Sequence, residues 1–344
     1  MPSIAVAGHI CLDITPQLRA SADIRPGHII EIGPATVSPG GSVANTGGVL
    51  ADLGSDITPF ATIGADEFGD ILRSRLECRG FSTTSLELSD RHATSYSLVI
   101  EKAGLDRTFW QHTGANDEFD GTGVPVDAFD LLHVGYPSLL PALRRDRGRA
   151  LHDLFVRARA AGTTTSLDLA VVDPAAGTNR DDWEQTLLSV FSECDIASPS
   201  LDDLTSALGI EEPYSPQLVD SLAQQILAQG VAVIAISAGR HGLHLRTGSA
   251  QRLRDAGRAL SPIAELWADR TLTLPPYAVD HHATTNGAGD ASTAGLLFAI
   301  CAGASPDQAL ALASACSAAV ISGRRPTAAA VSAIDSALAP LFSR

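Results

Sequence analysis

The stretch Thr285-Asn286-Gly287-Ala288-Gly289-Asp290 stands directly before an apolar, alanine-rich segment that we expect to be a helix over 289–303. Small residues let backbone N–H groups approach an anion closely, and a helix N-terminus adds its positive dipole. Such a turn can hold a phosphoryl group, and Asp290 beside it can accept a proton from an attacking hydroxyl. A simpler local interpretation is a turn formed by Gly287 and Gly289, with Asp290 capping the helix.

A second glycine stretch lies far from the first, at Pro39-Gly40-Gly41-Ser42-Val43-Ala44-Asn45. Its two glycines expose backbone N–H groups at a predicted helix start, and Asn45 follows within the helix. An asparagine side chain both donates and accepts hydrogen bonds, so this site suits a ligand with many hydroxyls. A tight turn with an internally bonded Asn45 explains the same residues.

The rest of the chain supplies an alternating rhythm of strands and helices. Apolar runs at 131–134, 164–169 and 231–237 predict buried strands, with helices expected between them and over 306–322. This alternation indicates a parallel sheet covered on both faces.

Three segments do not follow this rhythm. Residues 11–38 and 92–114 show strand-like alternation, with a hairpin turn expected at 103–106, and we expect them to form a small β-subdomain. Residues 249–270 show no clear period, and we expect a surface insertion there.

Composition limits the classes of function. The chain has 344 residues with 45% hydrophobic content, which fits one large domain with an appendage. Its 24 basic and 39 acidic residues give a net charge of −15. Nucleic acids and anionic membranes bind basic patches, so neither is an expected partner.

The cysteines and the apolar runs indicate the cellular compartment in which the protein is expected. The five cysteines are scattered without a CxxC pair, so neither a disulfide framework nor a zinc site is expected. No apolar run reaches the roughly 18 residues of a spanning helix. We therefore expect a cytoplasmic protein.

The motifs together resemble those of the ribokinase-like, or PfkB, family of carbohydrate and nucleoside kinases, in order along nearly the whole chain. The resemblance implies one domain over 1–344, of α/β class: a three-layer α/β/α domain with a mostly parallel central sheet and a small β-sheet lid formed by roughly 11–38 and 92–114. The motifs that carry it are Gly8-His9-Ile10-Cys11-Leu12-Asp13, Gly40-Gly41-Ser42-Val43-Ala44-Asn45, Ile63-Gly64-Ala65-Asp66-Glu67-Phe68-Gly69 and Thr285-Asn286-Gly287-Ala288-Gly289-Asp290.

The resemblance also assigns roles to single residues. Asp290 matches the catalytic base of the family, and Gly287, Ala288 and Gly289 match its anion hole. The remaining matches are Asp13, Gly40, Gly41 and Asn45 for substrate binding, Ser200, Ser237 and Gly239 for nucleotide binding, and Asp203 for the metal.

Three positions depart from the family pattern. The resemblance implies ATP and Mg²⁺ as cofactors. Thr284 replaces an aspartate of the monovalent-cation environment, so a monovalent cation is in doubt. Ser200 and Asp203 replace an Asn-x-x-Glu pair, and Gly135-Tyr136-Pro137 stands where many ribokinases have a glutamate.

The function implied is ATP-dependent phosphorylation of a hydroxyl, expected to be a hydroxymethyl group, of a small sugar. A nucleoside kinase and a non-catalytic sugar-sensing relative are alternatives. A dinucleotide-binding dehydrogenase is disfavoured, because Gly8 is not followed by a G-x-G-x-x-G pattern. Family members often form homodimers through the lid, which makes a homodimer a further expectation.

Overall fold

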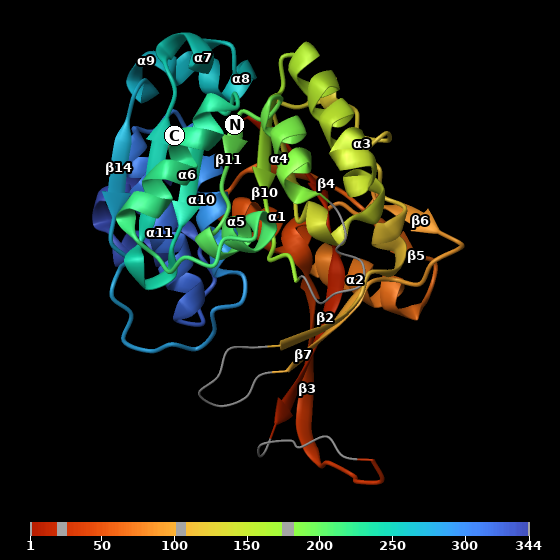
Figure 1. The fold of residues 1–344 in the computed structure, drawn as a ribbon. Helices are drawn as coiled ribbons and strands as arrows, with labels where there is room; N and C mark the ends of the chain where they lie inside the picture. The colour runs from red at the N-terminus through yellow and green to blue at the C-terminus, as the bar shows by residue number, and fades with distance from the viewer. Residues whose placement is uncertain (1, 19–25, 101–107, 174–181, 343–344) are drawn as a thin grey trace.

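The main element of the fold is an eight-stranded sheet, seen in a computed structural model that describes residues 2–18, 26–100, 108–173 and 182–342 (Figure 1). In order across the sheet, its strands are β14 (Thr271–Leu274), β13 (Leu243–Thr247), β12 (Val233–Ser237), β11 (Ile196–Ala197), β10 (Thr164–Asp168), β9 (Leu131–Gly135), β1 (Ser3–Gly8) and β4 (Asp56–Phe60). The six strands from β12 to β4 are parallel, while β13 pairs antiparallel with both β12 and β14. The prediction of a mostly parallel sheet is confirmed.

Helices cover both faces of this sheet. Alternate residues of β1 enter different cores: Ile4 and Val6 pack into one hydrophobic cluster, Ala5 and Ala7 into another. The helices are α1 (Gly41–Leu53), α2 (Glu67–Cys78), α3 (Pro141–Ala160), α4 (Trp183–Phe191), α5 (Leu201–Leu208), α6 (Pro216–Ala228), α7 (Ala250–Arg254), α8 (Gly257–Leu260), α9 (Ala264–Trp267), α10 (Ala288–Cys301), α11 (Pro306–Ile321) and α12 (Ala328–Ile334). Helices α1, α10 and α11 supply the first cluster, and α3, α4 and α6 the second. Among the described residues, no helix is long and apolar enough to span a bilayer.

Helix α3 contains a kink that the sequence analysis did not predict. Backbone angles from Arg145 to Gly148 are not helical, and Asp146 and Arg147 both have positive φ. The helix expected between the strands at 131–134 and 164–169 is therefore interrupted near its start.

A second, four-stranded sheet extends away from the main body in Figure 1. Its strand order is β3 (Ile32–Gly40), β2 (Cys11–Leu18), β7 (Tyr96–Ile100) and β8 (Thr108–His112). A small sheet built from the two expected segments is thus present. Residues 19–25 and 101–107, which include the expected hairpin turn, lie outside the described residues. A two-stranded pair, β5 (Thr62–Gly64) with β6 (Glu87–Ser89), completes the strands.

The four-stranded sheet has one polar and one apolar row across all its strands. Directly paired residues share a face, and successive residues of a strand point to opposite faces. The polar row consists of Ser38, Asp13, Ser97 and Gln111. The apolar row consists of Val37, Ile14, Leu98 and Trp110. The sheet therefore presents two chemically different surfaces.

The expectation of a surface insertion at 249–270 is wrong. Helices α7, α8 and α9 fill most of this segment, and Leu253, Leu260 and Trp267 are fully buried in the first hydrophobic cluster. The helices are only five, four and four residues long. Segments so short cannot display a helical period in the sequence.

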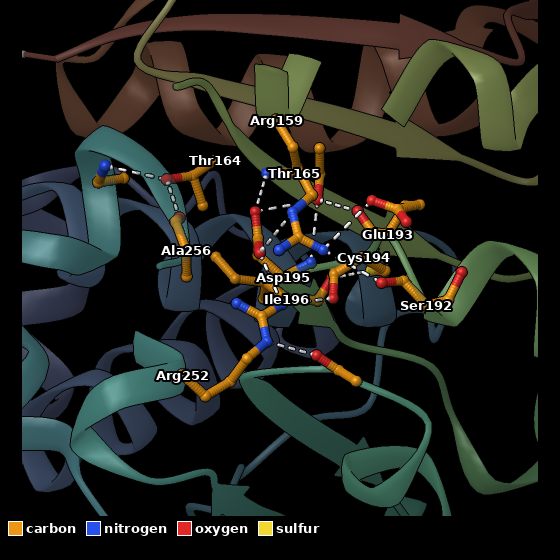
Figure 2. A network of polar contacts seen from close by, with 12 residues as sticks. Arg159, Thr164, Thr165, Ser192, Glu193, Cys194, Asp195, Ile196, Arg252 and Ala256 are labelled. Carbon is orange, nitrogen blue, oxygen red and sulfur yellow. Dashed lines mark hydrogen bonds and ion pairs between the residues drawn. The ribbon is translucent and has the colours of Figure 1, made fainter. Parts of the chain in front are cut away.

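A buried ion network fastens this segment to the sheet. Asp195, which precedes β11, is 0% exposed and accepts from Arg252 at 2.7 Å, with Arg159 3.8 Å away (Figure 2). The backbone N–H of Thr165 also donates to Asp195, at 2.9 Å. The network joins α3, α7 and β10 at the amino ends of the strands.

Replacing Asp195 by alanine removes the acceptor that two arginines share. We expect the free energy of unfolding, measured by urea titration, to fall by about 3 kcal/mol, because the largely buried Arg252 loses its carboxylate partner while Arg159 keeps Glu193. The control is Asp153→Ala, which breaks an exposed pair with Arg149 and should change stability by less than about 1 kcal/mol. Equal losses in the two variants would contradict a structural role for the network.

Candidate active site

The polar residues predicted from the glycine motifs gather at the carboxyl ends of the central strands. Strands β1, β9 and β10 end at Gly8, Gly135 and Asp168, and these three residues lie in register across the sheet. Ligands of open α/β sheets bind outside this edge.

Asp290 lies in the first turn of α10 and is 2% exposed. Its Oδ1 accepts from the Thr46 hydroxyl at 2.9 Å, and its Oδ2 accepts from Asn45 Nδ2 at 3.1 Å and from the Tyr136 hydroxyl at 2.7 Å. Asn45 and Asp290, predicted from separate motifs, are thus in direct contact although 245 positions separate them. Donors to a carboxylate stabilise its ionised form.

The glycine turn before α10 has the expected form. Gly287 has φ 76°, a conformation that favours glycine. It is the N-cap of the helix, and Ala288 is the first helical residue. A Cβ at Gly289 would meet no heavy atom within 4 Å, so packing does not require a glycine there. The first N–H groups of a helix lack partners within it, a property that suits an anion. In this structure the Ala288 N–H donates to the Thr285 carbonyl at 3.2 Å.

The start of α1 lies against β1 and β2 because of its two glycines. A Cβ at Gly40 would collide with the Asp13 carboxylate. Gly41 has φ 82°, and a Cβ there would lie 2.6 Å from the carbonyl oxygen of His9. The structure therefore brings Asp13, Gly40 and Gly41 together, as the motifs predicted.

Asp13 is buried and connected to the turn before α10. Burial raises the pKa of its carboxyl, with a smaller rise from the Asp290 charge, while hydrogen bonds from Cys11 and Asn286 lower it. Asn286 belongs to the turn, and its own N–H donates to the Thr284 hydroxyl at 3.0 Å. The two motifs thus form one continuous group of contacts.

The residues expected at the nucleotide lie at or just beyond the ends of the neighbouring strands β11 and β12. Ser200 and Ser237 form a bridge between adjacent segments. Ser237 and Gly289 line one small cavity, which runs along the start of α10. Gly239 follows β12 with φ 52° and opens a 3-10 turn.

Asp203 has a local role beside its expected one. Its carboxylate accepts from the Ser200 N–H at 2.8 Å, and the Ser200 hydroxyl accepts from the Asp203 N–H at 3.0 Å. This reciprocal pair is a capping box for α5. Burial raises the pKa of Asp203, and the Asp202 and Asp290 charges add to the rise.

Three residues of the site were not predicted: Thr46, Tyr136 and Asp168. Thr46 adjoins Asn45, and Tyr136 was noted only as a departure from the family pattern. Asp168 ends a buried strand, a position at which a carboxylate is itself a signal of a site. It accepts from the Leu169 N–H at 2.8 Å and the Thr293 hydroxyl at 3.2 Å. Burial raises its pKa well above the ordinary value, and the Asp203 and Asp290 charges add to this.

The carboxylates fit only part of a magnesium site. Asp168 and Asp203 offer the hard oxygen ligands that Mg²⁺ prefers. In the parts of the chain that the structure describes, no group of three or more His, Cys, Asp or Glu residues could hold a metal on its own. This donor set fits an ion that one or two carboxylates share with phosphate oxygens.

With this geometry, the fold is of the ribokinase-like α/β class. Residues 1–332 match the sequence profile described as pfkB family carbohydrate kinase, and the chain belongs to this family.

Relatives of known name are distant in sequence. Probable fructokinase-7 of Arabidopsis thaliana is 22% identical over 267 residues, which cover 76% of this chain and 69% of that protein. Arabidopsis thaliana ribokinase complexed with ribose and ATP superposes with TM-score 0.73 at 16% identity, covering 97% and 98% of the two chains. The nucleoside kinase of Methanocaldococcus jannaschii gives TM-score 0.70 at 16% identity with the same coverage. At such identities the two solved structures support the fold alone.

Replacing Asp168 by asparagine tests the electrostatics of the site. Because folding raises the pKa of this carboxyl above its ordinary 3.8, the native state binds more protons than the unfolded state above that pH. Stability therefore falls as pH rises from about 4 toward the native pKa.

An asparagine cannot ionise, so we expect Asp168→Asn to gain about 1 kcal/mol in unfolding free energy at pH 7.5 and to lose this gain near pH 4. Urea titrations at both pH values measure it, with exposed Asp153→Asn as control. A variant less stable than wild type at pH 7.5 would show that the carboxylate is net stabilising.

Proposed function

We propose that the protein is an ATP-dependent kinase that phosphorylates a hydroxyl, in particular a hydroxymethyl group, of a small sugar. The observation that carries the proposal is the Asp290 carboxylate, buried and held by three donors directly behind the Gly287-Ala288-Gly289 turn. A proton acceptor is thereby placed beside a backbone site for an anion, which is the pairing that phosphoryl transfer to an alcohol needs.

The sugar would bind between α1 and the polar row of the small sheet. Asp13, Gly40, Gly41 and Asn45 supply carboxylate, backbone and amide groups for its hydroxyls. Ser97 and Gln111 extend these groups along the sheet. The stretch from Gly40 to Asn45 has no basic residue, which favours an acceptor without a phosphate of its own.

In the reaction, the acceptor hydroxyl loses its proton to Asp290 while its oxygen bonds to the γ-phosphorus. The bond from that phosphorus to the bridging oxygen breaks, and ADP leaves. The N–H groups of Gly287, Ala288 and Gly289 would stabilise the charge on the transferred group. The small sheet would act as a lid that excludes water and so limits ATP hydrolysis.

Ser200, Ser237 and Gly239 would contact the nucleotide. Asp203, with Asp168 nearby, would hold Mg²⁺ together with phosphate oxygens. The ion would supply charge neutralisation at the phosphates. The proposal includes no monovalent cation, because Thr284 replaces the aspartate of that environment.

A cytoplasmic location stays a prediction.

A nucleoside is the second candidate acceptor, and one residue favours it. Phe109 lies two positions from Gln111 on β8 and so shares the face of the polar row. Its side chain is 43% exposed. A ring at this position could stack on a base, and stacking on an aromatic ring contributes about 1–3 kcal/mol.

The first test is ADP release from ATP with a panel of pentoses, hexoses, polyols and nucleosides. Asp290→Asn removes the proton acceptor and should lower kcat by about 10²–10⁴, while Asp153→Asn should leave it unchanged. Turnover confined to nucleosides would select the second candidate. Sugar binding by calorimetry without any turnover would instead support the sensing alternative.

We also propose that two copies associate through the apolar row of the small sheet. Val37, Ile14, Leu98 and Trp110 form a continuous apolar strip, and Trp110 is 48% exposed. Burial of such a strip stabilises an association by roughly 25 cal/mol per Å².

Leu98→Ser with Trp110→Ser should convert the dimer to a monomer in sedimentation velocity, while retaining the far-UV spectrum of the fold. The control is Val156→Ser, which changes an exposed apolar residue on α3. A wild-type monomer, or a dimer that survives the double change, would contradict this surface.

A further inference from the structure

Tyr136 combines an unusual backbone with a direct contact to the proposed base. Its φ of 64° and ψ of 52° lie in the left-handed region, which non-glycine residues adopt rarely and at an energetic cost. The strain is maintained by its surroundings. The Tyr136 N–H donates to the Asp168 carbonyl at 3.1 Å, and Pro137 fixes the chain that follows.

The preceding residue contributes to the same arrangement. A Cβ at Gly135 would collide with the Ser42 side chain, so this glycine lets β9 end directly against α1. Strained conformations that persist in a rigid frame are typical of functional positions. Here the frame directs the Tyr136 phenol toward α10.

The phenol contacts the oxygen of Asp290 that also accepts from Asn45. Among the side-chain donors described for this carboxylate, the Tyr136 hydroxyl is the closest, at 2.7 Å against 2.9 and 3.1 Å. Burial and the Asp290 and Asp168 charges raise the pKa of Tyr136 well above its usual range. The hydroxyl therefore keeps its proton and remains a donor at neutral pH.

Several acidic groups surround Asp290. Among the described groups, the Asp290 charge raises the pKa of Cys11 and Asp13 of β2, Tyr136, Asp168 of β10 and Asp203 of α5. These five groups are acids. Nearby carboxylates disfavour ionisation of Asp290, whereas hydrogen bonds to its oxygens favour it. The balance between this repulsion and these hydrogen bonds decides whether Asp290 is ionised and can accept a proton.

We propose that Tyr136 is a positioning residue that fixes the Asp290 carboxylate and keeps it ionised for proton transfer. This inference rests on the proposed function, since it concerns the same base. Tyr136 acts through Asp290 and needs no contact of its own with the acceptor.

The test is Tyr136→Phe, which keeps the ring and removes only the donor. We expect kcat to fall about tenfold, because hydrogen bonds to charged groups are the stronger ones, while KM for the acceptor changes less than about twofold. The acid limb of the kcat profile should move to higher pH by about one unit. The control is Tyr277→Phe, which removes a matched phenol–carboxylate bond of 2.6 Å to Asp335 and should leave the pH profile unchanged.

A second measurement does not depend on turnover. In ¹³C-aspartate-labelled protein, the Asp290 carboxyl signal is assigned by its loss in Asp290→Asn, and its titration midpoint should rise in Tyr136→Phe. Tyr136→Gly provides a second variant without the donor, since glycine adopts the left-handed region freely. If wild type turns over no acceptor, the proposed function fails, and this titration still decides the role of Tyr136.

Two results would overturn the inference. One is an unchanged Asp290 titration and acid limb in both variants. The other is a higher kcat or a markedly lower KM in Tyr136→Phe, which would mean that the phenol competes with the acceptor for Asp290.

Discussion

The close approach of the N-termini of α1 and α10 is the constraint on which the site depends. Glycines at 40 and 41 let the start of α1 lie against Asp13 and His9, which a Cβ at those positions would meet. The contact is closed by the hydrogen bonds from Asn45 and Thr46 to Asp290. Because these partners come from opposite ends of the chain, the site cannot exist in a local fragment. It forms only when strands β1, β9 and β10 have brought the two helices to the same edge of the sheet.

Buried carboxylates have different surroundings at the two ends of the sheet strands. At the amino ends, Asp195 is surrounded by two arginines and a backbone donor, an arrangement that secures α7 to the core. At the carboxyl ends, the pKa values of Asp13, Asp168 and Asp203 are raised, mainly by burial. Such carboxylates lower stability at neutral pH, a feature more often found at functional positions than in the supporting structure. The first end maintains the architecture, and the second presents negative oxygens where a cation and phosphates would be bound.

The features predicted correctly from the sequence were those with a periodic hydrophobic pattern or a short motif. Continuous apolar runs predicted the parallel strands, and the strand-like segments 11–38 and 92–114, which do not follow the alternation of strands and helices, predicted a second sheet. Neither signal exists for α7–α9, whose helices have at most five residues, so their burial could not be foreseen. The contacts of Tyr136 and Asp168 were hidden for a different reason. They depend on strand order, which places the ends of β9 and β10 side by side. The sequence placed Asp290 and Asn45 in one site through resemblance to a family, while their mutual contact emerged only from the fold.

Two of the three departures from the family pattern share a physical direction. Thr284 replaces an aspartate, and Gly135-Tyr136-Pro137 stands where many ribokinases have a glutamate. The hydroxyls of Thr284 and Tyr136 both bond within the site. Thr284 accepts from the Asn286 N–H, and Tyr136 donates to Asp290. An acidic residue at either position would add charge beside Asp13, Asp168 and Asp290, and would need a cation or acceptor hydroxyls to balance it. In this chain neutral hydrogen bonds organise the same loops. Under the proposed function, the acceptor would find its partners chiefly on α1 and the polar row of the small sheet. The chemistry of that row, rather than the end of β9, would then decide which hydroxyls are recognised.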